Sequence, residues 1–390
     1  MRILDLNKET TSNILESLLK RSPNSYGEYE SRVAAIIEEV RKNRDAAVFS
    51  YTKQFDRAEI NADNIVVTDE EINEAYATVA PELLDVIRKS LVNIRAFHSK
   101  QLQNSWFTSG ENGTILGQKV TPLDKVGVYV PGGKAVYPSS VLMNVVPAKV
   151  AGVPHIYMTT PPGADGKIAA STLVAAKEAG VDTIYKVGGA QAIAALAFGT
   201  ESVPKVDKIC GPGNAYVAAA KRLVYGTIDI DMVAGPSEVL VIADESANPK
   251  YIAADLLSQA EHDVLASAVL LTTSETLARK VDEEILRQSA YLSRRAIIEQ
   301  SLTDFGAAIV CPDLSACAAL ANEIAPEHLE ICTKEPRALL PLILNAGAVF
   351  LGENAPEPLG DYLAGPNHVL PTSGTARFFS PLSVDSFLKT

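Results

Sequence analysis

The amino-acid sequence predicts an α/β protein with two Rossmann-like domains on parallel sheets, one inserted in the other, and a helical N-terminal segment. From residue 125 onward, short apolar stretches alternate with stretches of helical periodicity. Nearly every apolar stretch ends in a turn rich in glycine or proline. This combination is typical of parallel sheets whose strands are joined by helices.

The first hundred residues are predicted to be mainly helical. Residues 28–55 carry apolar side chains at helical spacing. Thr68 followed by Glu71 fits a capping box, in which both side chains satisfy free N–H groups at a helix start. Pro81 is expected to begin the next helix. Residues 106–123 combine strand-forming residues with Gly and Asn turns, so a hairpin follows.

The alternation of strands and helices sets the expected domain boundaries. The compact series of strand, glycine-rich turn and helix begins near residue 125 and ends near the AGPS turn at 234–237. The pattern resumes after it, and the last segment is rich in loops. We therefore expect a helical arm (1–25), a discontinuous larger α/β domain (26–124 with 236–375), an inserted α/β domain (125–235) and the start of a C-terminal tail (376–390).

Composition excludes several classes of protein. The net charge is −12, from 35 basic and 47 acidic residues, which argues against a nucleic-acid-binding protein. No apolar run approaches the roughly 20 residues that a membrane span requires. The N-terminus lacks the apolar core of a signal peptide. The four cysteines show no C-x-x-C spacing, so buried thiols in a cytoplasmic protein are expected.

Glycine-rich turns after parallel strands are candidate ligand sites, because glycine lets the backbone approach a phosphate at a helix N-terminus. The turn GPGNAY at 211–216 comes closest to a dinucleotide fingerprint, but Tyr216 occupies the place of the third glycine. No acidic partner for a ribose follows at the expected position. A single such turn can serve tight chain reversal alone, whereas several in series favour a ligand cleft.

The chain has only five histidines, so each can be weighed. His98 is expected to be solvated and His155 to be structural. His262 follows Gln259 by three residues in the motif SQAEHD, which puts both on one helix face about 5–6 Å apart at Cβ. Asn248 is the expected cap of this helix. A glutamine is a poor ligand for structural zinc, so a surface or capping role competes with metal binding.

Two further motifs carry polar pairs. APEHLEI places Glu327 and His328 between a helix and an apolar strand, as two proton carriers for one cleft or as a helix-end charge pattern. The segment 356–372 is a long loop with Asp361 and His368, which is typical of a functional loop or of a surface crossover stiffened by prolines.

Taken together, the motifs resemble the histidinol dehydrogenase family, in the family's order and over nearly the whole chain. The resemblance implies a zinc-dependent, NAD-linked oxidation of L-histidinol to L-histidine through L-histidinaldehyde, in two hydride transfers, as the last step of histidine biosynthesis. It also implies one Zn²⁺ per subunit and a homodimer whose sites are shared across the interface. The motifs that carry it are VPGGKAVYPSS, KVGGAQAIAALAFGT, ICGPGNAYVAAAK, DMVAGPSEVLVIAD, LLSQAEHD, APEHLEI and LGDYLAGPNHVLPT.

The resemblance assigns roles by motif. It implies zinc ligands at Gln259, His262 and Asp361, and acid–base residues at Glu327 and His328. It implies NAD contacts at Tyr129, Gln191 and Asn214. The expected substrate contacts are Ser237, Gln259, His262, His328, Asp361 and His368.

One departure concerns the C-terminus. Family members continue past SPLSVDSFLK with a helical tail that supplies a Glu to the substrate site and a His to the partner's zinc, whereas this chain ends at Thr390. The expectation is a truncated or naturally short form with weaker zinc binding and low activity. The alternatives are a related zinc- and NAD-dependent dehydrogenase of another small diol, such as a sulfonated propanediol, and a non-catalytic relative.

Overall fold

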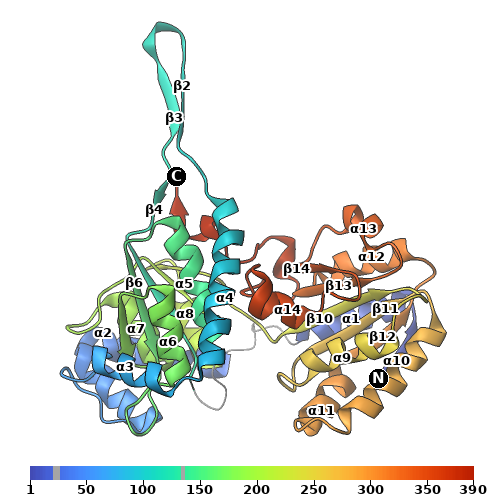
Figure 1. Cartoon of the computed structure of the whole chain (residues 1–390), viewed down its shortest axis with the longest axis horizontal. Coiled ribbons are helices and arrows are strands. Elements are labelled where there is room, and N and C mark those ends of the chain that lie inside the picture. Colours follow the sequence, from blue (N-terminus) through green and yellow to red (C-terminus); the bar gives the residue numbers. More distant parts are fainter. Residues whose placement is uncertain (21–26, 133–136) are drawn as a thin grey trace. The chain divides into compact units, whose positions relative to one another are not determined.

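The computed structural model describes residues 1–20, 27–132 and 137–390 and divides the chain into two compact units (Figure 1). Unit 1 consists of Met1–Pro23, Ala234–Gly360 and Leu370–Pro381. Unit 2 consists of Asn24–Val233, Asp361–Val369 and Leu382–Thr390. Part of the glycine-rich turn after residue 130 and part of the predicted N-terminal arm lie outside the described residues.

Unit 1 is built on a parallel sheet of six strands in the order β1-β12-β11-β10-β13-β14. Successive side chains of its strands point to opposite faces. Val239 and Val241 of β10 therefore pack with α9, α10 and α11, whereas Leu240 and Ile242 pack with α1 and α12. The strands are β1 (Arg2–Asp5), β10 (Glu238–Ala243), β11 (Ser267–Thr272), β12 (Gly306–Val310), β13 (His328–Cys332) and β14 (Ala348–Leu351).

The helices of unit 1 begin where the sequence offers caps. Asn248 caps α9 through its side chain, with Pro249 in the first turn, which confirms the predicted helix start. Ser274 and Asp313 cap α10 and α12 in the same way. The helices are α1 (Lys8–Lys20), α9 (Pro249–Ala260), α10 (Glu275–Ser289), α11 (Arg295–Phe305), α12 (Leu314–Ile324), α13 (Pro336–Leu339) and α14 (Glu357–Leu359).

Unit 2 carries the second parallel sheet, in the order β7-β6-β5-β8-β9. The two parallel sheets confirm the predicted α/β class. The strands are β5 (Lys125–Tyr129), β6 (His155–Thr160), β7 (Thr183–Lys186), β8 (Lys208–Cys210) and β9 (Asp229–Ile230). The helices are α2 (Gly27–Asp56), α3 (Asp69–Thr78), α4 (Pro81–His98), α5 (Pro138–Ala151), α6 (Ala170–Ala179), α7 (Gly189–Phe198) and α8 (Ala215–Val224).

The division into units differs from the predicted domains. The sequence groups residues 26–124 with 236–375, whereas the structure places 24–124 with the sheet of unit 2. The apolar face of α2 packs on α7 and α8, and those of α3 and α4 pack on α5 and α6. Helical periodicity shows that a helix has a buried face, but it does not identify the surface that covers that face.

The two chain ends also differ from the sequence-based expectation. The predicted helical arm over 1–25 starts instead with β1, which pairs in parallel with β12 at the edge of the sheet of unit 1. At the other end, residues 376–390 divide between the units. There β15 (Leu388–Lys389) pairs antiparallel with β4 (Thr121–Pro122). Both short strands depend on partners far away in the sequence, so local patterns do not reveal them.

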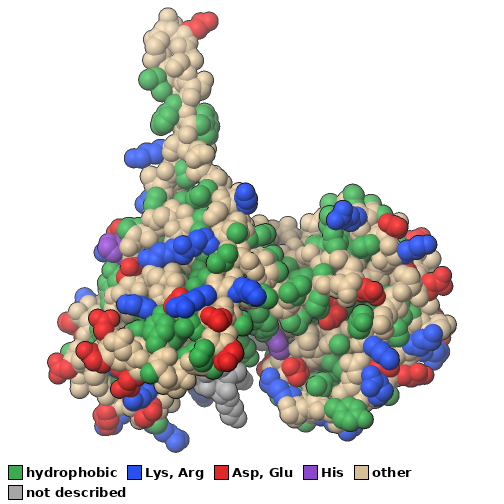
Figure 2. Space-filling view, in the orientation of Figure 1, with side chains coloured by type: hydrophobic (Ala, Val, Ile, Leu, Met, Phe, Trp, Pro, Cys, Tyr) green, Lys and Arg blue, Asp and Glu red, His purple; other side chains and the backbone are tan. Residues whose placement is uncertain are grey.

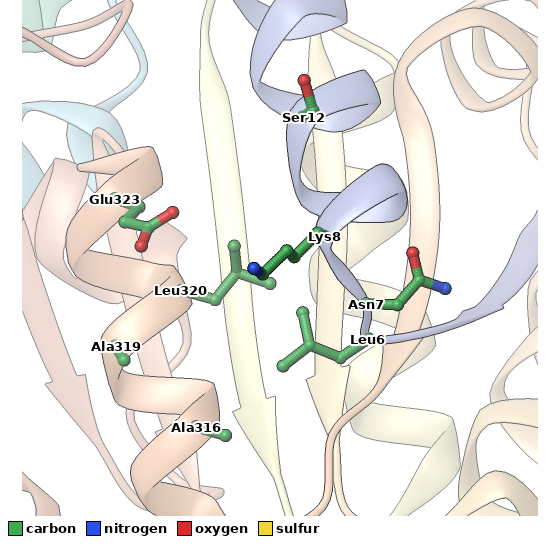
Figure 3. A pocket seen from close by; sticks show the side chains of 8 residues that line it. All are labelled: Leu6, Asn7, Lys8, Ser12, Ala316, Ala319, Leu320 and Glu323. Carbon is green, nitrogen blue, oxygen red and sulfur yellow. The ribbon is translucent and has the colours of Figure 1, made fainter.

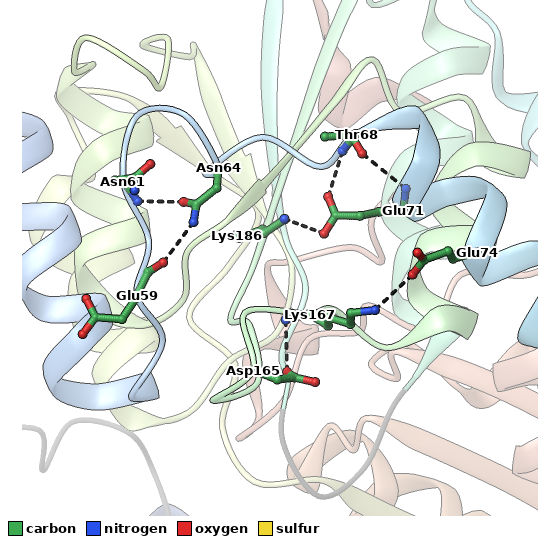
Figure 4. Close-up of polar contacts among 9 residues, drawn as sticks. All are labelled: Glu59, Asn61, Asn64, Thr68, Glu71, Glu74, Asp165, Lys167 and Lys186. Carbon is green, nitrogen blue, oxygen red and sulfur yellow. Dashed lines mark hydrogen bonds and ion pairs between the residues drawn. The ribbon is translucent and has the colours of Figure 1, made fainter.

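The predicted capping box at Thr68 is confirmed, and it belongs to a wider polar network in unit 2 (Figure 4). The Glu71 side chain accepts from the Thr68 backbone N–H at 2.9 Å and also pairs with Lys186 Nζ at 2.5 Å. Lys167 Nζ pairs with Glu74 at 3.0 Å. These contacts join α3 to the carboxyl end of β7 and to the turn before α6.

His98 is not solvated, so that prediction is wrong. Its side chain is fully buried at the end of α4, and Nδ1 lies 2.7 Å from Gln101 Oε1. Burial lowers the pKa of His98 below the ordinary value. The charged neighbours in the sequence face away from it, because only one face of α4 meets α5.

The predicted hairpin is confirmed as β2 (Trp106–Ser109) paired antiparallel with β3 (Ile115–Gln118). It projects away from the sheet of unit 2 (Figure 1). No helix within the described ranges is both long enough and apolar enough to cross a membrane.

Candidate active site

In unit 1, the predicted acid–base pair lies at the amino-terminal edge of the sheet, where β10 and β13 are neighbours. The Glu327 carboxylate accepts a hydrogen bond from the backbone N–H of Glu238 at 2.9 Å. His328 Nδ1 lies 2.9 Å from the Glu238 carbonyl oxygen. Both side chains are buried, and the carboxylate lies 3.6 Å from Nδ1. The side chains therefore face the backbone of the neighbouring strand β10 rather than solvent.

The tautomer of His328 follows from these contacts. A carbonyl oxygen only accepts hydrogen bonds, so Nδ1 must carry the proton in the neutral ring. Nε2 is then the unprotonated ring nitrogen, which is the state that a general base requires. On the Nε2 side of the ring, Oε1 of the Glu357 carboxylate lies at 4.0 Å. Glu327 and His328 are buried, whereas charged residues at a helix end would be exposed to solvent. Their burial therefore argues against the alternative of a helix-end charge pattern.

Gln259 lies in the last turn of α9 with only 1% of its side chain exposed. Neither its amide oxygen nor its amide nitrogen has a hydrogen-bond partner within the described part of the chain. A buried polar group left in this state costs about 1–3 kcal/mol. The surface alternative considered for Gln259 is therefore wrong, and its oxygen fits a metal ligand.

His262 does not share the helix with Gln259. The helix ends at Ala260, and His262 lies exposed in the following turn, where its backbone N–H reaches the Gln259 carbonyl at 3.1 Å. Arg294 donates to the His262 carbonyl at 3.1 Å. The spacing rule for helices therefore does not apply to this pair, although a backbone hydrogen bond joins the two residues, which are three positions apart. Ser237, which precedes β10, lies at the same sheet edge and accepts from the Ser267 N–H at 3.1 Å.

A second buried carboxylate in unit 1 was not identified from the sequence. Glu357 begins α14 with 3% exposure, accepts from Ser258 Oγ at 3.3 Å and donates its backbone N–H to Glu330 at 2.9 Å. Burial, together with the charge of Asp255, raises the pKa of Glu330 to about 9. Burial also raises the pKa of Asp255. Side chains alternate along β13, so Glu330 points to the same face as His328. This alternation is the only sequence signal that places Glu330 near the site.

In unit 2, two of the predicted NAD residues lie at the carboxyl edge of the sheet. Tyr129 ends β5, and its hydroxyl oxygen accepts from the Gly189 N–H at 3.2 Å, at the start of α7. Gln191 lies in the first turn of α7, and its buried amide has no partner among the residues that the structure describes. Parallel strands end at one edge, and helix N-termini there offer free N–H groups to a phosphate.

Asn214, the third predicted NAD residue, caps α8. Its side-chain oxygen accepts from the N–H groups of Tyr216 and Val217 at 3.0 and 3.1 Å. The preceding Gly211 has a φ of 117°, and a Cβ at this position would collide with the Tyr129 carbonyl oxygen. The glycine therefore lets the turn after β8 approach the end of β5.

The long loop contributes Asp361 and His368 to unit 2. His368 Nδ1 lies 4.0 Å from Asp361 Oδ2, and the ring of Tyr362 stands edge-on to His368. Hydrogen bonds to the carbonyls of Tyr362 and Leu363 from α4 hold the loop. This ordered pair favours a functional loop over a plain surface crossover.

Two hollows lie outside these clusters. One of about 620 Å³ lies in unit 1 between the start of α1 and α12, where Figure 3 shows Lys8 and Glu323 on opposite walls. It is shallow and holds none of the predicted site residues. The other, of about 360 Å³, lies in unit 2 past the ends of β5 and β6 and is lined by Asp56, Pro131 and Thr160. The second hollow adjoins the end of β5, where Tyr129 lies.

Comparison with known proteins finds relatives over almost the whole chain. Residues 19–390 match the family described as Histidinol dehydrogenase. The histidinol dehydrogenase of Heliobacterium mobile is 61% identical over 358 residues, which are 92% of this chain and 84% of that protein. That of Caldanaerobacter subterraneus subsp. tengcongensis is 58% identical over 389 residues, 100% of this chain and 90% of that protein. The crystal structure of histidinol dehydrogenase from Elizabethkingia anophelis superposes with a TM-score of 0.94 at 39% identity and covers 100% of this chain and 89% of that one.

Proposed function

We propose, from the premise that this chain belongs to the histidinol dehydrogenase family, that it oxidises L-histidinol to L-histidine with NAD and uses Glu327 and His328 as its acid–base pair. The observation that carries these roles is the hydrogen bond from His328 Nδ1 to the Glu238 carbonyl, because it leaves Nε2 as a base. The reaction is the last step of histidine biosynthesis.

In the first half-reaction, Nε2 of His328 takes the proton of the substrate hydroxyl while a hydride leaves the same carbon for NAD. The product is L-histidinaldehyde. Burial of His328 keeps water from competing for Nε2, and its bond to β10 holds the ring in one orientation.

In the second half-reaction, the Glu327 carboxylate removes a proton from the water that attacks the aldehyde, and the hydrate then loses the second hydride to another NAD. The hydrogen bond from the Glu238 N–H orients this carboxylate. The two residues thus divide the two half-reactions between them.

For zinc, the proposed donors are Gln259, His262 and Asp361. An amide oxygen, an imidazole nitrogen and a carboxylate oxygen form a donor set that zinc accepts. The buried amide of Gln259, which has no hydrogen-bond partner among the described residues, supports this assignment. When bound by these residues, zinc would supply Lewis-acid chemistry that orients and polarises the substrate. Ser237 and His368 are the further substrate contacts.

For NAD, the residues are Tyr129, Gln191 and Asn214. They lie at or just after the carboxyl ends of three strands of one sheet, and the Gln191 amide has no hydrogen-bond partner in the described part of unit 2. The helix N-termini of α7 and α8 suit the pyrophosphate.

We also propose a homodimer with sites shared between subunits. The hairpin supports it, because Trp106, Phe107, Ile115 and Leu116 are each more than half exposed, and hydrophobic side chains cover part of its surface in Figure 2. The four cysteines are buried and free, which fits a reducing compartment such as the cytoplasm.

The test is NADH formation from L-histidinol by the purified chain supplied with zinc, with His328→Gln beside it. We expect the parent protein to form two NADH per histidinol. We expect the His328→Gln variant to lose the first hydride transfer. A parent chain that reduces NAD with a sulfonated propanediol but not with histidinol would overturn the substrate, and a fully active variant would overturn the base.

A further inference from the structure

The buried carboxylate of Glu357 faces the nitrogen of His328 that takes up the substrate proton. Its Oε1 lies 4.0 Å from Nε2, and its Oε2 accepts a hydrogen bond from Ser258 Oγ at 3.3 Å. The other ring nitrogen is engaged by the Glu238 carbonyl at 2.9 Å. Glu357 therefore places a carboxylate on the side of the ring where Nε2 takes up the proton.

Proton transfer makes His328 an imidazolium that is only 3% exposed. A buried charge is costly unless an opposite charge lies close to it. Glu327 is near Nδ1, but one of its oxygens already accepts from the Glu238 N–H. Glu357, at 3% exposure, lies on the Nε2 side, where the new proton arrives, and an attraction between unit charges at this distance is strong away from bulk water.

The carboxyl group of Glu330, which interacts with that of Asp255, holds Glu357 in this place. Glu330 Oε1 accepts the backbone N–H of Glu357 at 2.9 Å. The other oxygen, Oε2, is buried and has no hydrogen-bond partner within the described ranges, and the charge of Asp255 on α9 acts on the Glu330 carboxyl. Two buried carboxyl groups that repel each other avoid this repulsion when one of them binds a proton. Burial and the charge of Asp255 raise the pKa of Glu330 to about 9, so the pair holds a proton at neutral pH.

We propose that Glu357 is a positioning residue of the acid–base site, whose carboxylate balances the charge that His328 acquires at Nε2, and that Glu330 holds Glu357 there through its backbone N–H. The inference rests on the proposed role of His328 as the base of the first half-reaction. The proton moves from the substrate hydroxyl to Nε2 and the hydride moves to NAD, so Glu357 gains and loses no atom.

The first test is Glu357→Gln in the full chain with zinc, assayed separately with histidinol and with histidinaldehyde. The amide keeps the shape and the Ser258 contact but removes the charge. We expect kcat for the histidinol half-reaction to fall about tenfold, the equivalent of one pKa unit, while the KM for NAD, the bound zinc and the thermal midpoint stay as in the parent. The matched control is Glu353→Gln, an exposed carboxylate of the same segment, with parental kcat.

The second test uses Glu330. Glu330→Leu removes the acceptor for the Glu357 N–H and should lower kcat, whereas Glu330→Gln keeps an acceptor and a neutral group and should restore it. In the Glu357→Gln background, Glu330→Leu should add little, because both changes act on one charge.

The outcomes separate the two proposals. Parental kcat in Glu357→Gln overturns the inference, and so does loss of bound zinc in that variant, which would make Glu357 a metal ligand. Additive losses for Glu330→Leu and Glu357→Gln overturn the link between them. Full activity of His328→Gln overturns the proposed base itself, whereas an inactive His328→Gln beside an unaffected Glu357→Gln removes only the role of Glu357.

Discussion

Glu327 and Glu238 are joined by a hydrogen bond of 2.9 Å, in which the backbone N–H that opens β10 donates to the carboxylate that precedes β13. A glutamine at 327 can accept the same bond through its amide oxygen, but it cannot take a proton from water. Glu327→Gln is therefore expected to keep its fold and to slow histidinaldehyde oxidation far more than histidinaldehyde formation. Single-turnover NADH formation from each substrate measures the two steps, and equal losses would contradict the division of labour.

Removal of the unpartnered amide of Gln259 should change stability and metal binding in opposite directions. In the presence of a chelator, Gln259→Leu should raise the free energy of unfolding by about 1–3 kcal/mol. The substitution removes a buried polar group that destabilises the fold because it has no hydrogen-bond partner among the described residues. The same variant should bind less zinc. Denaturant unfolding and metal analysis measure the two effects, and Gln288→Leu on α10 is the control that leaves zinc unchanged. A destabilised, zinc-replete Gln259→Leu protein would argue against a ligand role.

The exposed apolar side chains of the hairpin should be needed for the dimer. Phe107→Asp combined with Leu116→Asp places charges where β2 and β3 present apolar surface, so the variant should sediment as a monomer and lose activity. Leu286→Asp on α10 replaces a leucine that is 66% exposed and should leave the mass unchanged. A hairpin variant that remains dimeric at micromolar concentration would place the interface elsewhere.

The raised pKa of Glu330 should make stability depend on pH. Between the ordinary pKa of 4.5 and the folded-state value of about 9, the folded chain retains a proton that the unfolded chain has released. The free energy of unfolding therefore falls as the pH rises through this window. Glu330→Gln has no proton to release, so its thermal midpoint should fall less between about pH 5 and pH 9. Glu283→Gln, an exposed change on α10, should keep the parental slope, and an unchanged slope in Glu330→Gln would show that Glu330 ionises normally.

Local chemistry in the sequence predicted most of the elements. Thr68 with Glu71 and Asn248 with Pro249 mark helix starts in the structure, because capping needs only residues a few positions apart. The hairpin at 106–118 follows for the same reason. The grouping of α2 to α4 with the second sheet was not predicted, because the partner of an apolar helix face is chosen by long-range packing.

In the candidate site, too, some features could be predicted from the sequence and others only from the tertiary structure. The motifs SQAEHD and APEHLEI indicated Gln259 and His328 through their resemblance to a family. The sequence did not show that Gln259 is buried, or that its amide has no hydrogen-bond partner among the described residues. Glu357 carried no sequence signal at all.

By itself, the sequence determined the α/β class, the positions of the turns and the residue types available for chemistry, since these depend on periodicity and on residues close in the chain. Only the tertiary structure decided which ring nitrogen of His328 carries the proton and which carboxylates surround the ring. The reason is that tautomer and charge depend on desolvation and on hydrogen bonds from β10, α9 and α14, whose residues lie up to 90 positions from His328.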